Sequence, residues 1–150
     1  AVTASLAGHP RLRFVSAHLD THGRPPGGSM FYRPGAGRAA QARALAHSLD
    51  DDDAVTLLGA DLNSVLGMTD PAVLALVEAG MHPGRRIGRW RHTYHHPVRM
   101  LVDHVMFRAP AGAVESVDVA RLDQAPGDRS RRVFGSDHHP LLAHVQFAHA

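Results

Sequence analysis

The sequence predicts one α/β domain in which strands outnumber helices and the elements pack in layers. Three observations support this prediction. The chain has 150 residues, an ordinary length for a single domain. Short apolar runs bounded by Gly, Pro or Asp, typical of strands, recur along the chain. Only two segments, 38–49 and 70–79, have the apolar spacing or capping residues of helices.

The composition narrows the class of protein without selecting a function. Apolar residues make up 44% of the chain, as in ordinary globular domains. There is no cysteine, which excludes disulfides and thiolate metal sites. We see no apolar run of about 18 residues, the length of a transmembrane helix, and no leader sequence. All 16 basic residues are arginine and the net charge is +2, which fits a phosphate-bearing substrate but leaves the compartment open.

The first strands and loop follow from turn signals. Residues 2–6 and 12–19 are predicted to be strands, joined by a turn at Gly8-His9-Pro10. Residues 20–37 are rich in Gly and Pro and have no apolar period, so they are predicted to form a long loop. A long loop within a compact domain is often functional.

The two predicted helices rest on different signals. Segment 38–49 has alanine and leucine near helical spacing, and its exposed face is predicted to carry Arg38, Gln41 and Arg43. The second helix begins with Asp70 at the cap and Pro71 at the first helical position, and it ends at Gly80.

Strands and loops alternate in the remaining C-terminal part. The apolar runs at 100–107, 114–119 and 141–147 are predicted to be strands. The segments 81–100 and 121–135 are rich in Arg and lack an apolar period, so both are predicted to be loops.

An acid and an amide stand at the end of the strand predicted at 55–61. Residues two apart on an extended backbone point the same way, so Asp61 and Asn63 are expected to face one spot. A carboxylate can hold a hard cation or a proton, and an amide can orient a phosphate oxygen or a water. A plain turn, where both residue types are common, is the alternative.

Other polar residues stand at or near strand ends. His18 ends the second predicted strand. Asp103 lies within an apolar strand, where a carboxylate is costly unless a partner such as a histidine N–H pairs with it. Asp137 and His138 precede the last strand and can supply a metal ligand and a general base from one short loop.

Four motifs occur along the chain in this order: Val15-Ser16-Ala17-His18-Leu19-Asp20, Gly59-Ala60-Asp61-Leu62-Asn63-Ser64, Leu101-Val102-Asp103-His104-Val105 and Ser136-Asp137-His138-His139-Pro140. Together they resemble the endonuclease/exonuclease/phosphatase superfamily, the DNase I-like metal-dependent phosphoesterases. The pair Arg38 and Gln41 on the first helix also matches a pattern common in that family. The resemblance extends over about residues 4–147 and implies a DNase I-like four-layer α/β sandwich, of which this chain is the C-terminal part, mostly antiparallel strands with two helices.

The resemblance covers only part of a family domain. The N-terminal portion, which in the family carries an Asn and the Glu that is the main magnesium ligand, has no counterpart in residues 1–150. Neither Glu78, in a predicted helix, nor Glu115, at the start of a strand, stands where it could replace that Glu. The resemblance thus implies a partial domain whose other half comes from an upstream segment or a separate chain.

The family's activity implies a role for the acid–histidine pair. The resemblance implies a phosphoesterase, dependent on Mg²⁺ or Mn²⁺, that hydrolyses a phosphodiester or nucleic acid by in-line attack of water. His138 would be the general base and would also contact the phosphate. Asp103 would hold the His138 imidazole in the required tautomer.

The resemblance also implies roles for the remaining residues. Asp61 would orient the attacking water or bind the metal, and Asp137 would contribute to the cation site. His18 and Asn63 would bind phosphate oxygens. Arg38 and Trp90 are further candidates for contact with the substrate.

Several alternatives remain open at this point. The chain could be a non-catalytic half-domain that binds phosphate or nucleic acid, or a phosphatase of phospholipids or sugar phosphates. A zinc site could use His18 and His22 or the adjacent histidine pairs, although zinc needs three or four converging ligands. The Arg-rich segments 85–91 and 129–132 could contact a nucleic-acid backbone or form solvated loops. His104 is expected to point away from Asp103, in a packing or surface role.

Overall fold

The computed structural model describes residues 2–4, 10–20, 35–49, 53–95, 97–122 and 136–148. The predictions made for the turn at 8–9, most of the loop at 20–37, His22 and segment 129–132 lie outside these residues. Within them, no helix is long and apolar enough to cross a membrane.

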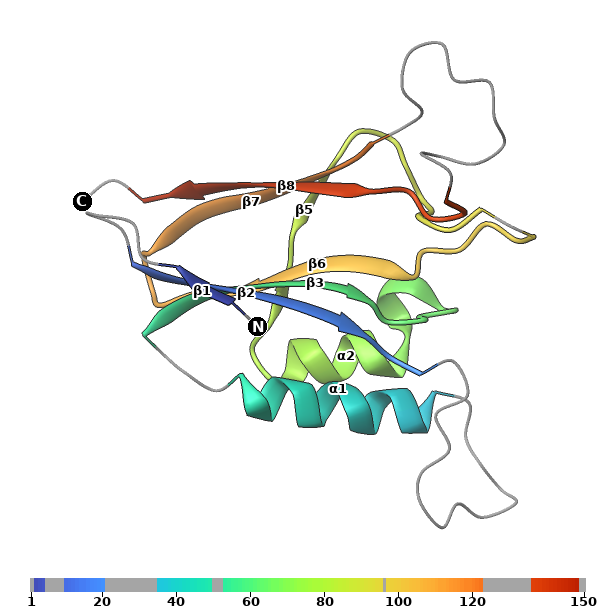
Figure 1. Ribbon diagram of the computed structural model, residues 1–150, viewed down its shortest axis with the longest axis horizontal. Coiled ribbons are helices and arrows are strands. Elements are labelled where there is room, and N and C mark those ends of the chain that lie inside the picture. The colour runs from blue at the N-terminus through green and yellow to red at the C-terminus, as the bar shows by residue number, and fades with distance from the viewer. Residues whose placement is uncertain are drawn as a thin grey trace.

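Two sheets and a pair of helices form three layers (Figure 1). A five-stranded sheet has the order β1-β2-β3-β6-β4, and a three-stranded sheet has the order β5-β7-β8. The helices cover one face of the larger sheet, and the smaller sheet lies over its other face (Figure 1). The elements are β1 Val2–Ala4, β2 Arg11–His18, α1 Ala36–Ser48, β3 Ala54–Asp61, a 3₁₀ turn η1 Gly67–Thr69, α2 Pro71–Glu78, β4 His82–Pro83, β5 Arg85–Ile87, β6 Asp103–Arg108, β7 Val114–Arg121 and β8 Leu141–Phe147.

The register of the larger sheet brings three of the candidate residues into one row. β2 and β3 are parallel, and His18 is paired with Asp61. β3 and β6 are antiparallel, and Asp61 is paired with Asp103. Since paired residues on neighbouring strands project to the same face, these three side chains lie at one edge of the sheet.

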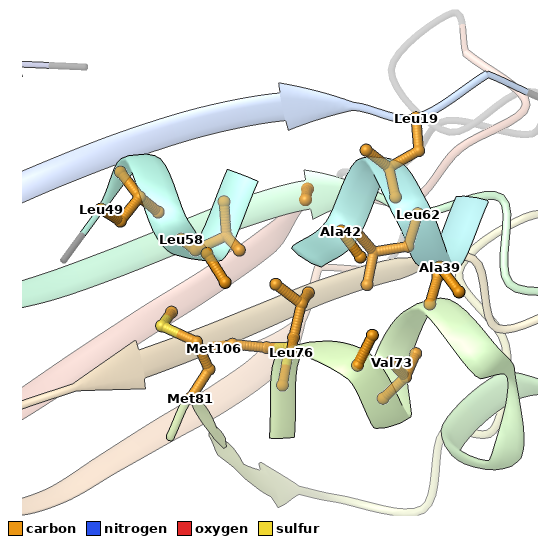
Figure 2. Packing of buried hydrophobic residues seen from close by; sticks show 14 of the residues in the cluster. Leu19, Ala39, Ala42, Leu49, Leu58, Leu62, Val73, Leu76, Met81 and Met106 are labelled. Carbon is orange, nitrogen blue, oxygen red and sulfur yellow. The ribbon is translucent and has the colours of Figure 1, made fainter. Parts of the chain in front are cut away.

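The core lies between the larger sheet and the helices (Figure 2). Alternate residues of β3 and β6 point into it, because successive side chains of a strand face opposite sides. Leu58, Leu76 and Met106 are fully buried there. Since burial of such side chains contributes about 1.5–3 kcal/mol each, this layer supplies much of the stability that holds the opposite face in place.

The predicted start of the second helix is confirmed. The Asp70 side chain accepts the N–H of Ala72 at 3.1 Å, and Pro71 occupies the first helical position. Gly80 has φ 83°, a conformation that favours glycine, directly after the helix.

Arg38 was predicted to be exposed and to be available to substrate, and both predictions are wrong. Its side chain is buried, with an exposed fraction of 7% for the residue, and its Nη2 donates to Asp70 Oδ2 at 3.1 Å. The same carboxylate caps α2, so the ion pair joins the two helices. The first helix packs this face against α2, a contact that its own periodicity does not reveal.

Two corrections concern segment 81–107. The segment predicted as a loop contains two short strands, β4 and β5, and the strand predicted at 100–107 begins only at Asp103. Both short strands depend on distant partners, since β4 pairs with β6 and β5 with β7. Gly84 lets the chain pass between the sheets, because a Cβ there would lie 2.5 Å from Val119 Cγ2.

Candidate active site

Polar side chains from three strands and one loop line a cleft of about 480 Å³ at the edge of the larger sheet. His18 ends β2, Asp61 ends β3 and Asp103 begins β6, while His138 comes from the loop before β8. Gly59 forms part of the wall, and a Cβ there would meet no atom within 4 Å. The structure thus brings together four of the residues selected from the sequence.

Asp103 and His138 form a hydrogen-bonded pair. His138 Nδ1 lies 2.9 Å from Asp103 Oδ2, although 35 residues separate them in the chain. An ionised carboxylate only accepts hydrogen bonds, so Nδ1 carries the proton and donates it. The tautomer that results leaves Nε2 as the basic nitrogen of His138. The Asp103 side chain is 20% exposed and the His138 side chain 34% exposed, so the pair can still exchange protons with solvent.

Thr93 holds both partners of this pair and was missed by the sequence analysis. Its buried hydroxyl accepts the N–H groups of Val102 and Asp103 at 3.2 and 3.0 Å. Its carbonyl accepts the N–H of His139 at 2.7 Å. One residue therefore fixes the start of β6 and the loop that carries His138. The signal in the sequence was a β-branched polar residue within a loop rich in Arg and His.

Tyr94 and His95 extend this attachment to the His138 loop. The Tyr94 ring centroid lies 5.0 Å from that of His138, and the two residues form an isolated β-bridge. The N–H of His95 donates to the carbonyl of Asp137 at 3.1 Å. The loop is thus held by backbone hydrogen bonds on both sides of His138.

Asp61 lies close to a second carboxylate, Asp103, at the partly buried end of β3. Burial raises the pKa of its carboxyl group above the ordinary value, and the negative charge of Asp103 acts in the same direction. The N–H of Asn63, which donates to Asp61 Oδ1 at 2.8 Å, opposes this shift. His18 Nε2 lies 3.6 Å from Asp61 Oδ2, and its side chain is 73% exposed. A cation near Asp61 would relieve the repulsion between the carboxylates.

Asn63 does not adopt the extended geometry that was predicted. β3 ends at Asp61, and Asn63 has φ 48°, in the left-handed region. Its Nδ2 donates to the carbonyl of Leu19 at 2.7 Å. The side-chain amide of Asn63 therefore ties the end of β3 to the end of β2. Its backbone N–H donates to Asp61 Oδ1 and closes a tight turn. The shared direction of Asp61 and Asn63, inferred from an extended backbone, is thus wrong.

The carboxylate that gathers with Asp61 is Asp103 rather than Asp137. Ligand atoms of Asp61, Asp103 and His138 lie within 4.8 Å of one another, and this is the one such group among the residues that the structure describes. The two carboxylates suit a hard cation, which prefers oxygen ligands. In the described part of the chain, no three histidines offer ligand atoms within 4.8 Å of one another, and His22 and His96 of the zinc alternative lie outside it.

His104 is confirmed in a packing role on the opposite face of β6. Its Nε2 lies 2.7 Å from Ser64 Oγ, and Ser64 donates to the carbonyl of Leu101 at 2.8 Å. Burial lowers the pKa of His104 to about 4, so the ring is neutral at pH 7. Trp90 lies outside the cleft and lines a neighbouring hollow beside Arg89 and Arg91.

Comparison with known proteins supports the fold through structure alone. No family model and no curated protein matches the sequence. A Bacteroides thetaiotaomicron protein of the endonuclease/exonuclease/phosphatase family is 18% identical, with a TM-score of 0.59 over 85% of this chain and 46% of that chain. Sphingomyelinase C from Streptomyces griseocarneus is 17% identical, with a TM-score of 0.63 over 98% and 56%. D. rerio TDP2, complexed with a single-strand DNA product, is 19% identical, with a TM-score of 0.60 over 93% and 57%.

These likenesses define the architecture. The chain has the DNase I-like α/β fold that endonuclease/exonuclease/phosphatase structures share, as the resemblance implied. It spans about half of the length of the solved structures that it matches. The identities are low, so the likeness shows the fold and leaves activity to be argued from the cleft.

Proposed function

We propose that the protein acts as a metal-dependent phosphoesterase, and specifically as a phosphodiesterase, with His138 as the general base. The observation that carries this proposal is the 2.9 Å contact of His138 Nδ1 with Asp103 Oδ2 at the edge of an open cleft. That contact leaves Nε2 available to take a proton from water. The solved structures of the same fold include phosphoesterases, which agrees with this chemistry.

The proposed reaction is in-line attack of water on phosphorus. His138 Nε2 takes the proton of the water, and Asp103 stabilises the imidazolium that forms. Asp61, close to both, orients the water. His18, the most exposed of the four, donates to a phosphate oxygen as negative charge develops on it.

A divalent cation, Mg²⁺ or Mn²⁺, fits the carboxylate oxygens of Asp61 and Asp103, which supply part of the ligands that such an ion needs. Asp61 would hold it, because its carboxyl is close to a second carboxylate and Asp103 is already engaged by His138. Such an ion, when bound, withdraws charge from phosphoryl oxygens. One or two protein carboxylates with water and substrate phosphate are the usual magnesium ligands. The roles of Asp137 at the cation and of Asn63 at the phosphate rest on the resemblance.

Hydrolysis of a panel of phosphoesters tests the proposal. The panel holds plasmid DNA, a chromogenic phosphodiester, sphingomyelin and a sugar phosphate, each with Mg²⁺, with Mn²⁺ and with EDTA. We expect metal-dependent cleavage of a diester that falls at least about a hundredfold in His138→Ala. His47→Ala, which removes an exposed histidine of α1, is the matched control and should change the rate less than twofold.

The outcomes separate the proposal from its alternatives. A His138→Ala rate within threefold of the wild type would remove His138 from the role of base. Hydrolysis confined to the sugar phosphate, a monoester, would favour a phosphatase. Hydrolysis confined to sphingomyelin, itself a phosphodiester, would keep the phosphodiesterase and make its substrate a lipid. If this chain hydrolyses none of the substrates, the proposal that it is an enzyme by itself is contradicted, and the non-catalytic binding half-domain is favoured.

A further inference from the structure

Arginine side chains gather in a hollow beside the cleft, on the loop between β5 and β6 and at the end of β7. This hollow has a volume of about 420 Å³, and no carboxylate of the described residues lines it. A second hollow of about 640 Å³ adjoins it and adds Arg86. We call the first hollow the arginine groove; its lining is Arg89, Trp90, Arg91, His92, Arg99 and Arg121.

The charges of the groove differ from those of the neighbouring Arg85. Arg85 Nε and Nη2 donate to Asp118 at 2.7 and 2.9 Å, which neutralises the guanidinium. Arg89, Arg91 and Arg99 are exposed and form no ion pair with another residue that the structure describes. Guanidinium groups without a carboxylate partner at a concave surface attract anions. Each guanidinium can donate two hydrogen bonds to the oxygens of one phosphate.

Trp90 provides a flat apolar wall between the two hollows. Its Nε1 donates to the carbonyl of Ile87 at 2.8 Å, and the Arg86 guanidinium lies 5.8 Å from the ring centroid. The ring is therefore held in place while it lines both hollows. An aromatic face beside arginines is the arrangement on which single-stranded bases stack while their phosphates are neutralised.

The groove and the cleft adjoin at two histidine rings, since His92 lines the groove and His139 lines the cleft. The His92 ring centroid lies 5.5 Å from that of His139, which lines the cleft next to His138. Arg121 Nη1 donates to the carbonyl of His92 at 3.0 Å, so His92 is fixed at this junction. A chain with one phosphate at His138 that runs past His139 and His92 would bring its next phosphates to the arginines.

We propose that the arginine groove binds the backbone of single-stranded nucleic acid that extends from the phosphate in the cleft, an inference that rests on the proposed phosphodiesterase function. A sugar phosphate has a single anionic group and would not reach the groove. A bilayer is broad and flat, whereas the arginines line a concavity. A repeating phosphate chain with stackable bases matches the arginines and the indole together.

Binding without turnover tests the groove directly. Fluorescence anisotropy of a labelled oligothymidylate of about ten nucleotides, in EDTA and across a salt series, measures affinity and its salt dependence. We expect Arg89→Gln/Arg91→Gln to weaken binding at least about tenfold and to make the slope of log K against log salt shallower by about 1.4. Trp90→Leu should weaken binding about tenfold and leave the slope unchanged, because stacking releases no counterions.

Matched controls separate the groove from general charge effects. Arg43→Gln removes an exposed arginine of α1 and should change affinity less than twofold. Vesicles that contain phosphatidylserine test the lipid source of phosphate. The proposal is overturned if the oligonucleotide does not bind, if the double variant binds within twofold of the wild type, or if the double variant loses vesicle binding only.

The failure of this inference and that of the proposed function give different results. His138→Ala should abolish hydrolysis of the small chromogenic diester, whereas Arg89→Gln/Arg91→Gln, outside the cleft, should change that hydrolysis by no more than about twofold. Groove-dependent binding without any hydrolysis would contradict the phosphodiesterase and support the groove. Hydrolysis that requires His138, with no groove-dependent binding, would support the enzyme and overturn the groove.

Discussion

Two imidazoles lie on opposite sides of the start of β6, His104 from β6 itself and His138 from the loop before β8, and they differ in burial and in hydrogen-bond partner. His104 is buried on the helix-covered face, where its Nε2 contacts Ser64 and burial lowers its pKa to about 4. His138 lies on the open face, paired with Asp103, and its side chain is 34% exposed. The comparison teaches that residues 103 and 104, adjacent in the chain, can serve chemistry and packing respectively, because a strand sends them to opposite faces.

The same division applies to the whole of the larger sheet. Residues that face the helices are buried and, apart from polar ones such as His104 and Thr56, apolar, while those at the edge of the opposite face carry the charges of the cleft. Stability should therefore depend on one set of alternate residues and activity on the other. Four predictions test this division, from the largest expected effect to the smallest.

The first prediction compares adjacent leucines of β3. Leu58 is fully buried against the helices, and Leu57 is only partly buried on the opposite face. Leu58→Ala should cost about 3 kcal/mol of unfolding free energy, because it leaves a cavity in a packed core. Leu57→Ala should cost clearly less. Urea unfolding measures both, and equal losses would show that the two faces contribute alike.

The second prediction concerns the pair on the open face. Asp103→Asn should lower the rate of diester hydrolysis at least about a hundredfold, about 2.7 kcal/mol of barrier, because the amide favours the wrong tautomer of His138. Asp118→Asn, at the exposed pair with Arg85, is the control and should not slow hydrolysis. A change in metal affinity alone, with the rate at saturating metal preserved, would argue against the pairing with His138.

The third prediction tests the attachment that joins β6 to the His138 loop. Thr93→Val leaves the N–H groups of Val102 and Asp103 without their acceptor and should cost about 2 kcal/mol. Thr93→Ser keeps the hydroxyl and should cost less than about 1 kcal/mol. Thermal unfolding and amide exchange at residues 102 and 103 measure the effect. Similar losses in both variants would assign the role of Thr93 to its methyl group.

The fourth prediction is a pH dependence that belongs to His104. Its pKa is about 4 in the folded protein and about 6.5 when unfolded, so the unfolded state binds more protons between these values. Stability should therefore fall by about 1 kcal/mol from pH 7.5 to 5.5 through this group alone. Denaturant unfolding in EDTA at both pH values, in wild type and in His104→Asn, isolates the term. The same change in unfolding free energy between the two pH values in both proteins would contradict this assignment to His104.

Much of the fold and part of the site could be predicted because their signals are local. The cap formed by Asp70 and Pro71, the end of β3 at Asp61 and the last strand at 141–147 each depend on neighbouring residues in the chain. The need of Asp103 for a histidine partner also followed from its apolar surroundings, and the structure supplies His138.

Beyond this pair, only the tertiary structure decided which side chains meet. Arg38 is buried by a second helix, Asn63 turns back toward Leu19, and Arg99 and Arg121 join Arg89 and Arg91 in one groove. The physical reason is that periodicity and turn residues report the backbone near each position. Burial, ion pairing and the convergence of charges depend on elements far apart in sequence that the packed sheets bring together.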